Sequence, residues 1–119
     1  SSTGPFSIGF SDNKTGIVVG GNYLKDKENT NNVLLTTNGG KNWTRPMSPV
    51  LGYRSAVEHL KGQFWVATGS SGTDYSIDGG QHWINISTLN FNAVQKAKNG
   101  QLVLLTGNRG NIYQLIQPL

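Results

Sequence analysis

Side chains that could carry out acid–base or nucleophilic chemistry are few in this sequence. Tyr53, Arg54, Glu58 and Asp74 are the candidates for a hydrolytic site, which needs a cation to bind substrate, a nucleophile and an acid–base carboxylate. Glu58 follows Arg54 by only four residues, and nothing in the sequence places three arginines together. We therefore expect no catalytic residues and lean towards a protein that is not an enzyme.

Metal, cofactor and nucleic-acid sites are not indicated either. His59 and His82 are far apart, with no carboxylate cluster at metal-ligand spacing. Cysteine is absent, which excludes disulfides, thiolate metal sites and cysteine nucleophiles. The net charge of +4 comes from scattered basic residues, whereas nucleic-acid-binding domains usually concentrate theirs on one face. We expect no metal, no cofactor and no nucleic-acid partner.

The composition favours short strands joined by tight turns. The 119 residues include 16 Gly, 13 Asn, 10 Ser and 10 Thr, which tolerate turn conformations or bond to nearby backbone. A helical bundle would need more Ala, Leu, Glu and Lys. No apolar run is long enough to cross a membrane, so membrane insertion is not expected. The length suits one small domain.

A repeat divides the sequence into three similar units. The octapeptides Thr36–Trp43 and Ser76–Trp83 share a hydroxyl residue, Asn or Asp two residues later, two glycines and a final tryptophan. A second similarity pairs Thr68–Tyr75 with Thr106–Tyr113, and apolar runs end just before Gly21, Gly69 and Gly107. A period near 40 residues with several strands per unit is typical of propeller blades. The pattern predicts eleven strands near 6–10, 16–20, 32–37, 43–46, 54–59, 64–68, 73–77, 83–86, 92–97, 101–106 and 111–116.

Both octapeptides resemble the Asp-box, or BNR repeat, written S/T-x-D/N-x-G-x-x-W. The sequence is similar to Asp-box β-propellers, both those like photosystem II stability and assembly factors and those like sialidases. The resemblance implies an all-β propeller fragment of about three four-stranded antiparallel blades, near residues 6–47, 53–87 and 91–119, the last blade lacking its fourth strand. Because the chain opens without methionine, we expect it to be excised from a longer chain. The missing blades would come from that parent chain or from a second copy.

The resemblance implies a structural role for the octapeptides. The Asp78 carboxylate is placed to accept hydrogen bonds from backbone N–H groups of the following turn, and at least one glycine of each pair should adopt a positive φ. Both tryptophans should fold over their turns and be largely buried at equivalent places. The structural residues of the two octapeptides are Thr36, Asn38, Gly40, Trp43, Ser76, Asp78, Gly80 and Trp83.

Binding is expected at the opposite end of the blades from the octapeptide hairpins. The first unit carries an insert, residues 23–32, between its second and third strands, at the end where the connections between blades also lie. There Arg54 offers a planar cation for a carboxylate or phosphate, unless it pairs with an acidic residue of a neighbouring blade, and Tyr53 offers an aromatic face. The candidate binding residues are Tyr53, Arg54, Asn90, Arg109, Lys25 and Lys27.

The leading hypothesis is a non-catalytic binding or assembly module of a secreted or periplasmic propeller, with a protein or glycan ligand. The alternative is a fragment of a sialidase-like or other glycoside hydrolase, whose site would draw on Tyr53, Arg54, Glu58 and Asp74.

Overall fold

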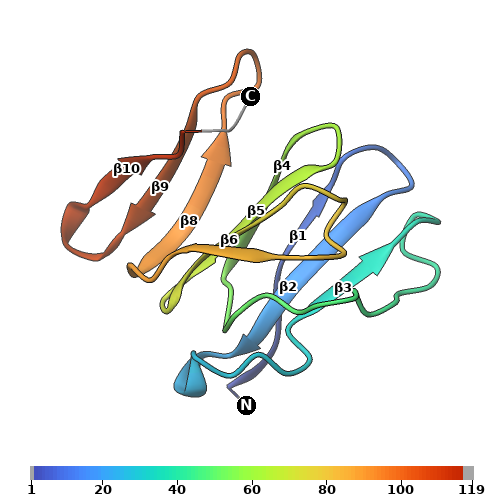
Figure 1. Ribbon diagram of the computed structural model, residues 1–119, viewed down its shortest axis with the longest axis horizontal. Coiled ribbons are helices and arrows are strands. Elements are labelled where there is room, and N and C mark those ends of the chain that lie inside the picture. Colours follow the sequence, from blue (N-terminus) through green and yellow to red (C-terminus); the bar gives the residue numbers. More distant parts are fainter. Residues whose placement is uncertain (1, 117–119) are drawn as a thin grey trace.

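The computed structural model describes residues 2–116, which form ten strands in three antiparallel sheets (Figure 1). Blade 1 contains β1 (Thr3–Phe10), β2 (Gly16–Asn22) and β3 (Val33–Thr36). Blade 2 contains β4 (Ala56–Lys61), β5 (Phe64–Gly69), β6 (Gly72–Ser76) and β7 (Ile84–Ser87). Blade 3 contains β8 (Phe91–Lys96), β9 (Val103–Gly107) and β10 (Ile112–Gln114). This is the all-β propeller fragment that the repeat predicts, and its last blade has three strands within the described residues.

Helical structure in the described residues is limited to two single 3-10 turns, η1 (Tyr23–Lys25) and η2 (Asn108–Gly110). No helix among residues 2–116 has the length and apolar character needed to cross a membrane. Within each sheet, every strand pairs with its neighbour in sequence.

The fourth strand expected near 43–46 does not form, so this part of the prediction is wrong. Only one bridge remains there, in which Leu35 and Thr44 exchange backbone hydrogen bonds of 2.8 Å. The next residues explain the early end, because Pro46 has no N–H to donate and restricts the backbone of Arg45. Blade 1 therefore has three strands where blade 2 has four.

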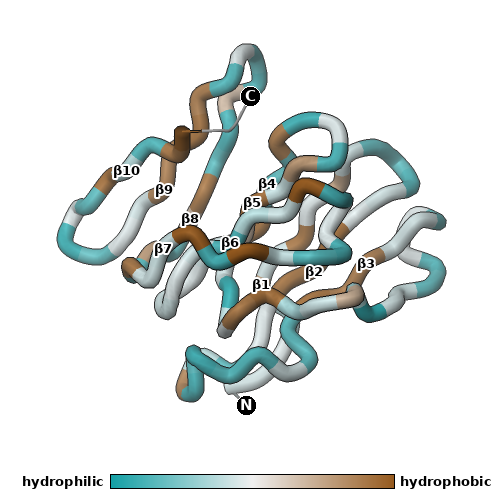
Figure 2. The backbone as a smooth tube through the Cα atoms, viewed as in Figure 1, coloured by the Kyte–Doolittle hydropathy of each residue, from teal (hydrophilic) through white to brown (hydrophobic). Residues whose placement is uncertain are grey.

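Two apolar clusters hold the three blades together. The first joins Ile17, Val19, Val33 and Leu35 of blade 1 to the blade 2 residues Val57, Trp65, Ala67 and Trp83. The second joins Leu60, Val66 and Tyr75 of blade 2 to Val103 of blade 3. Figure 2 shows that hydrophobic residues are concentrated in parts of the strands, while most of the connecting loops are hydrophilic. Burial between successive sheets is therefore the main source of stability.

Three glycines mark the same place in the three blades. A Cβ on Gly20, Gly69 or Gly107 would lie 2.0, 2.2 or 2.3 Å from the carbonyl oxygen of Gly4, Tyr53 or Asn90, at or just before the start of the first strand of each blade. The first of them is Gly20 and not Gly21, which corrects the register of the sequence repeat by one residue. Since no side chain fits there, all three positions require glycine.

The expected match between Tyr75 and Tyr113 is also off by one residue. Tyr75 lies opposite Val66, whereas Tyr113 lies opposite Leu105. The β9–β10 turn has one residue more than the Ser70–Ser71 turn between β5 and β6, and a shift of one residue moves a side chain to the other face of a sheet. Tyr75 is consequently buried, while Tyr113 is half exposed beside Phe91.

The two octapeptide tryptophans differ in burial, contrary to expectation. Trp83 is 6% exposed and belongs to the cluster with Ile17 and Leu35 of blade 1. Trp43 is only partly buried. Trp83 faces the preceding blade, and no blade among the described residues precedes blade 1, so Trp43 has no equivalent surface to cover it.

Candidate functional site

The insert of blade 1 is fixed to the neighbouring connections at one end of the blades. Asp26 makes this link: its main-chain oxygen accepts hydrogen bonds from the Tyr53 N–H at 2.9 Å and from the Ser71 hydroxyl. Its carboxylate accepts a 2.7 Å bond from the Ser70 hydroxyl. The insert, the β3–β4 connection and the β5–β6 turn thus form one connected surface, which we call the loop end.

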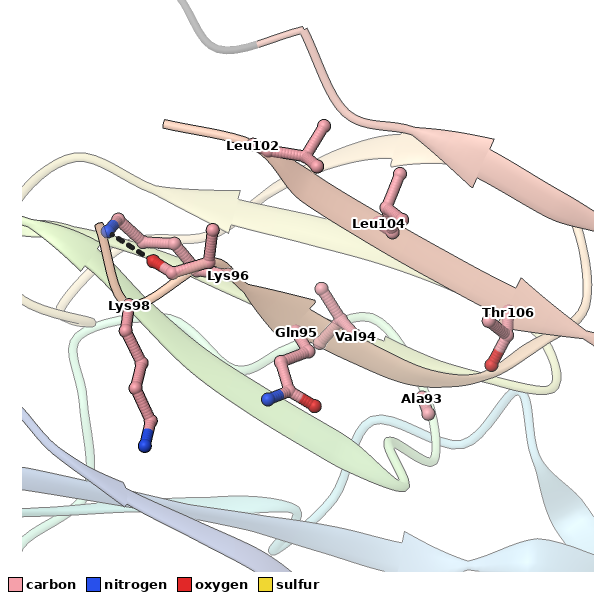
Figure 3. A pocket seen from close by; sticks show the side chains of 9 residues that line it. Ala93, Val94, Gln95, Lys96, Lys98, Leu102, Leu104 and Thr106 are labelled. Atoms are coloured by element: carbon pink, nitrogen blue, oxygen red, sulfur yellow. Dashed lines mark hydrogen bonds between the residues drawn. The ribbon is translucent and has the colours of Figure 1, made fainter. Parts of the chain in front are cut away.

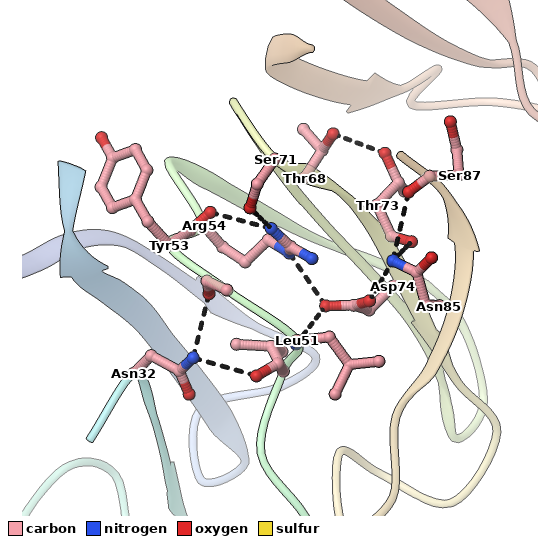
Figure 4. A network of polar contacts seen from close by, with 12 residues as sticks. Asn32, Leu51, Tyr53, Arg54, Thr68, Ser71, Thr73, Asp74, Asn85 and Ser87 are labelled. Atoms are coloured by element: carbon pink, nitrogen blue, oxygen red, sulfur yellow. Dashed lines mark hydrogen bonds and ion pairs between the residues drawn. The ribbon is translucent and has the colours of Figure 1, made fainter. Parts of the chain in front are cut away.

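A buried ion pair lies beneath the loop end (Figure 4). Arg54 Nε donates to Asp74 Oδ2 at 2.8 Å, and both side chains are fully buried. Asp74 also accepts bonds from the Leu51 N–H at 2.8 Å and from Asn85 Nδ2 at 3.0 Å. The pair therefore ties the β3–β4 connection to β6 and β7.

The remaining guanidinium nitrogens of Arg54 are also enclosed. Nη1 donates to the carbonyl oxygen of Tyr53 and to the hydroxyl of Ser71, both at 3.0 Å. Nη2 is buried without a hydrogen-bond partner among the described residues. The sequence predicts that Arg54 presents its charge to a ligand or pairs with an acidic residue of a neighbouring blade, but Arg54 pairs with Asp74 of its own blade. Ligand binding by Arg54 stays a prediction that this placement does not favour.

A polar hollow of about 550 Å³ opens at the loop end beside this ion pair. Of the expected binding residues only Lys27 lines it. The full lining is Asp26, Lys27, Leu51, Ser70, Ser71, Asn85 and Thr88. Ser70 and Ser71 were not predicted from the sequence. Their position in the turn between two predicted strands, at the same end of the blades as the insert, was the signal that could have found them.

Three aromatic rings pack edge to face at the same end. The ring centroids of Phe6 and Tyr53 are 5.0 Å apart, and Tyr23 lies 6.1 Å from Phe6 and 6.3 Å from Tyr53. Tyr53 is buried, which raises the pKa of its hydroxyl, and the nearby Tyr23 adds to this. Phe6 and Tyr23 are about half exposed, and Leu24 beside them is 73% exposed. We call Phe6, Tyr23 and Tyr53 the aromatic trio.

The other expected binding residues are exposed but do not line the hollow. Lys25 ends the short helix η1, next to Tyr23. Asn90 precedes β8, and Arg109 occupies the β9–β10 turn with a φ of 61°. The structure therefore brings Tyr53, Lys25 and Lys27 together at the insert, and leaves Asn90 and Arg109 on blade 3.

The two octapeptides, at the other end of the blades, form the same hydrogen-bond pattern. In the second, Ser76 Oγ donates to Asp78 Oδ1 at 2.9 Å, and the N–H groups of Gly80 and His82 donate back to these two side chains. In the first, Thr36, Asn38, Gly40 and Asn42 make the matching bonds. All four glycines have φ between 73° and 90°. These contacts explain the shared hydroxyl, Asn or Asp, and glycine positions by turn formation.

Asp78 supplies the carboxylate of the second octapeptide hairpin. Partial burial acts to raise its pKa, but hydrogen bonds from the backbone and ring of His82 and from Ser76 outweigh it and lower the pKa below its ordinary value. His82 Nδ1 lies 2.7 Å from the carboxylate. These groups stabilise the hairpin and face one another, not a cavity.

The residues considered for glycoside hydrolysis do not converge on an open site. Arg54 and Asp74 are fully buried against each other. Glu58 accepts a 2.7 Å hydrogen bond from the N–H of Lys96 in blade 3. This geometry lends no support to the hydrolase alternative. Among residues 2–116, no three His, Asp or Glu side chains lie together as metal ligands would.

Comparison with known proteins identifies the fold. No family model matches the sequence, and no curated protein matches it. A solved structure described as "YCF48 bound to D1 peptide" superimposes with a TM-score of 0.69 at 20% sequence identity, covering 96% of this chain. The chain spans 37% of the length of that protein. The likeness supports the assignment of the three sheets as propeller blades.

Proposed function

We propose that this chain is part of a non-catalytic β-propeller that binds an extended peptide segment of another protein at the loop end. The observation that carries the proposal is the meeting, at one end of a rigid scaffold, of the polar hollow and the aromatic trio around the insert of blade 1. The propeller of similar fold is described as bound to a peptide, which supports a peptide over a small substrate.

The chemistry of the loop end suits a peptide. Ser70, Ser71 and Asn85 supply hydroxyl and amide groups that can bond to a peptide backbone, and Lys27 can meet a carboxylate. Phe6 and Tyr23 present half-exposed rings for an apolar side chain. The insert carries both Lys27 and Tyr23, so it is the part of blade 1 that would give the site its specificity.

Two finer elements belong to this proposal. The octapeptides are Asp-box hairpins, supported by their matching hydrogen bonds, and they stabilise the blades away from the ligand. A secreted or periplasmic location, proposed from the sequence resemblance, fits a binding module but rests on no structural contact. A protein ligand is preferred to a glycan because the solved propeller of similar fold is described as bound to a peptide.

The proposal is tested by selecting binders to the immobilised chain from a random peptide library and titrating the enriched peptide against variants. Tyr23→Ala and Lys27→Ala should each weaken binding several-fold, because each removes a contact at the loop end. Lys61→Ala is the matched control, since Lys61 is an exposed lysine at the end of β4, at the opposite end of the blades. Equal losses in all three variants, or no peptide enriched over a blank surface, would contradict the proposal. Hydrolysis of aryl sialosides that disappears in Glu58→Gln would favour the enzyme instead.

A further inference from the structure

Three turns at the octapeptide end of the blades, opposite the loop end, contain an Asn or Asp followed by glycine. The dipeptides are Asn38–Gly39, Asp78–Gly79 and Asn99–Gly100, the last in the turn between β8 and β9. An asparagine before glycine can lose its side-chain amide, because a residue without Cβ lets its backbone nitrogen approach the side-chain carbonyl carbon. The structure holds the three dipeptides to very different degrees.

Both polar groups that this reaction uses are held in Asn38–Gly39. Asn38 Oδ1 accepts 3.0 Å hydrogen bonds from Thr36 Oγ1 and from the N–H of Asn42, and Asn38 Nδ2 donates to Asn42 Oδ1 at 2.9 Å. The N–H of Gly39 donates to the carbonyl oxygen of Lys14 at 2.9 Å. The nitrogen that would attack and the amide that would leave are therefore both fixed to other groups.

Asp78–Gly79 is held in the same way. Asp78 Oδ1 accepts 2.9 Å bonds from Ser76 Oγ and from the N–H of His82. The N–H of Gly79 donates to the carbonyl oxygen of Gln63 at 2.9 Å. The hydrogen bonds that form each octapeptide hairpin therefore also restrain its Asn–Gly or Asp–Gly dipeptide.

Asn99–Gly100 lies in its turn without such restraints. Both residues are exposed, and Gly100 has a φ of 94° with no atom within 4 Å of where its Cβ would be, apart from its neighbours in the chain. No hydrogen bond joins the Asn99 side chain or the Gly100 N–H to another residue in the described part of the chain. The Gly100 nitrogen and the Asn99 amide are therefore free to meet.

The surrounding turn can accept a new charge at this place. The Ala97 N–H donates to the Leu102 carbonyl oxygen at 2.8 Å, which closes the turn below Asn99, and Lys96 Nζ donates to the Ala97 carbonyl oxygen at 3.0 Å (Figure 3). The exposed Lys98 side chain is directed away from Lys96 in the same view. A carboxylate next to Lys98 would be solvated and would meet an opposite charge, so its formation should leave blade 3 folded.

We propose that Asn99 is a site of spontaneous deamidation and that the fold protects Asn38 from the same reaction. The Gly100 nitrogen gives up its proton to solvent and attacks Asn99 Cγ, which closes a succinimide ring. The bond from Cγ to the side-chain nitrogen breaks, and that nitrogen takes up a proton and leaves as ammonia. One water molecule then opens the ring at either carbonyl and leaves an aspartate or an isoaspartate. The inference is independent of peptide binding at the loop end.

The test is to hold the folded chain at mildly alkaline pH, digest samples at acidic pH and follow each dipeptide by mass spectrometry. The deamidated form of Asn99 should accumulate at least about tenfold faster than that of Asn38, which corresponds to about 1.4 kcal/mol of activation free energy. The chain unfolded in urea is the control, since both dipeptides should react at similar rates once the bonds around Asn38 are gone. Asn99→Gln should remove the first acidic species that ion-exchange chromatography separates.

Two variants identify the cause of the protection. Asn42→Ala removes the acceptor for Asn38 Nδ2 and should speed deamidation of Asn38 several-fold, whereas Thr37→Ala changes an exposed side chain of the same hairpin and should not. Melting curves set an incubation temperature at which both variants are folded. Equal rates at Asn38 and Asn99 in the folded chain overturn the proposal, as does an Asn99 that reacts only in urea. A folded Asn42→Ala variant with an unchanged rate at Asn38 contradicts protection by these hydrogen bonds.

Discussion

Replacing Arg54 with methionine should destabilise the fold strongly, and this prediction separates a structural arginine from a ligand-binding one. Methionine retains much of the apolar stem but removes the cation, which leaves the Asp74 carboxylate fully buried with only the Leu51 N–H and the Asn85 amide as donors. Removing one partner of a buried ion pair costs about 3–5 kcal/mol. The lost bonds from Nη1 to Tyr53 and Ser71 favour the upper part of that range.

The loss is large compared with the stability of a small domain, which is about 5–15 kcal/mol. Arg54→Met should therefore lower the melting temperature by about 10–30 °C. Urea unfolding followed by tryptophan fluorescence, at one fixed protein concentration, measures the change in free energy of unfolding. Arg45→Met is the control, because Arg45 is exposed and its variant should unfold within about 0.5 kcal/mol of the wild type.

A second variant identifies the buried charge as the cause. The double variant Arg54→Met/Asp74→Leu removes both charges and should recover part of the lost stability relative to Arg54→Met alone. A loss below about 1 kcal/mol in Arg54→Met, accompanied by weaker binding of the selected peptide, would refute this reasoning. That result would instead support the ligand-binding role that the sequence predicts for Arg54.

Three further predictions concern the octapeptides and the core. Hydrogen bonds lower the pKa of Asp78 below its ordinary 3.8 in the folded protein, so the stability that its carboxylate contributes is present above that pH and is lost as the pH falls. In Asp78→Asn, the melting temperature should therefore fall less between neutral and acidic pH than it does in the wild type. An unchanged dependence of melting temperature on pH would contradict this. Gly80→Ala should lower the free energy of unfolding more than Gly40→Ala in parallel urea titrations. Both glycines have φ near 90°, but a Cβ on Gly80 would lie 2.6 Å from Ile17 Cδ1, whereas the atom nearest to a Cβ on Gly40 is 3.5 Å away. The two losses should differ by about 1–3 kcal/mol, and equal losses would count against the packing of blade 2 on blade 1. Tyr75→Phe should leave the free energy of unfolding unchanged or raise it, because the buried Tyr75 hydroxyl has no hydrogen-bond partner among the described residues; a loss above about 1 kcal/mol would indicate a partner that the geometry lacks.

The sequence alone determines the features whose interactions lie within a few residues. Thr36–Trp43 and Ser76–Trp83 contain their own hydrogen-bond donors, acceptors and positive-φ glycines, so their hairpins follow from the local pattern. Most of the strands and the insert between β2 and β3 are likewise predicted by runs of apolar residues separated by turn formers. The insert's place at the loop end follows from the alternating direction of successive strands.

Only the tertiary structure decides the properties that depend on distant residues. The sequence shows an arginine beside a tyrosine, but the burial of Arg54 depends on Asp74, 20 residues away on another strand. Trp43 and Trp83 share one motif, yet their exposure differs because, within residues 2–116, a blade lies against Trp83 and none lies against Trp43. One extra residue in the β9–β10 turn moves Tyr113 to the opposite face from Tyr75. In each case local pattern sets the residue's place on its strand, while packing between sheets, a long-range interaction, sets what the side chain meets.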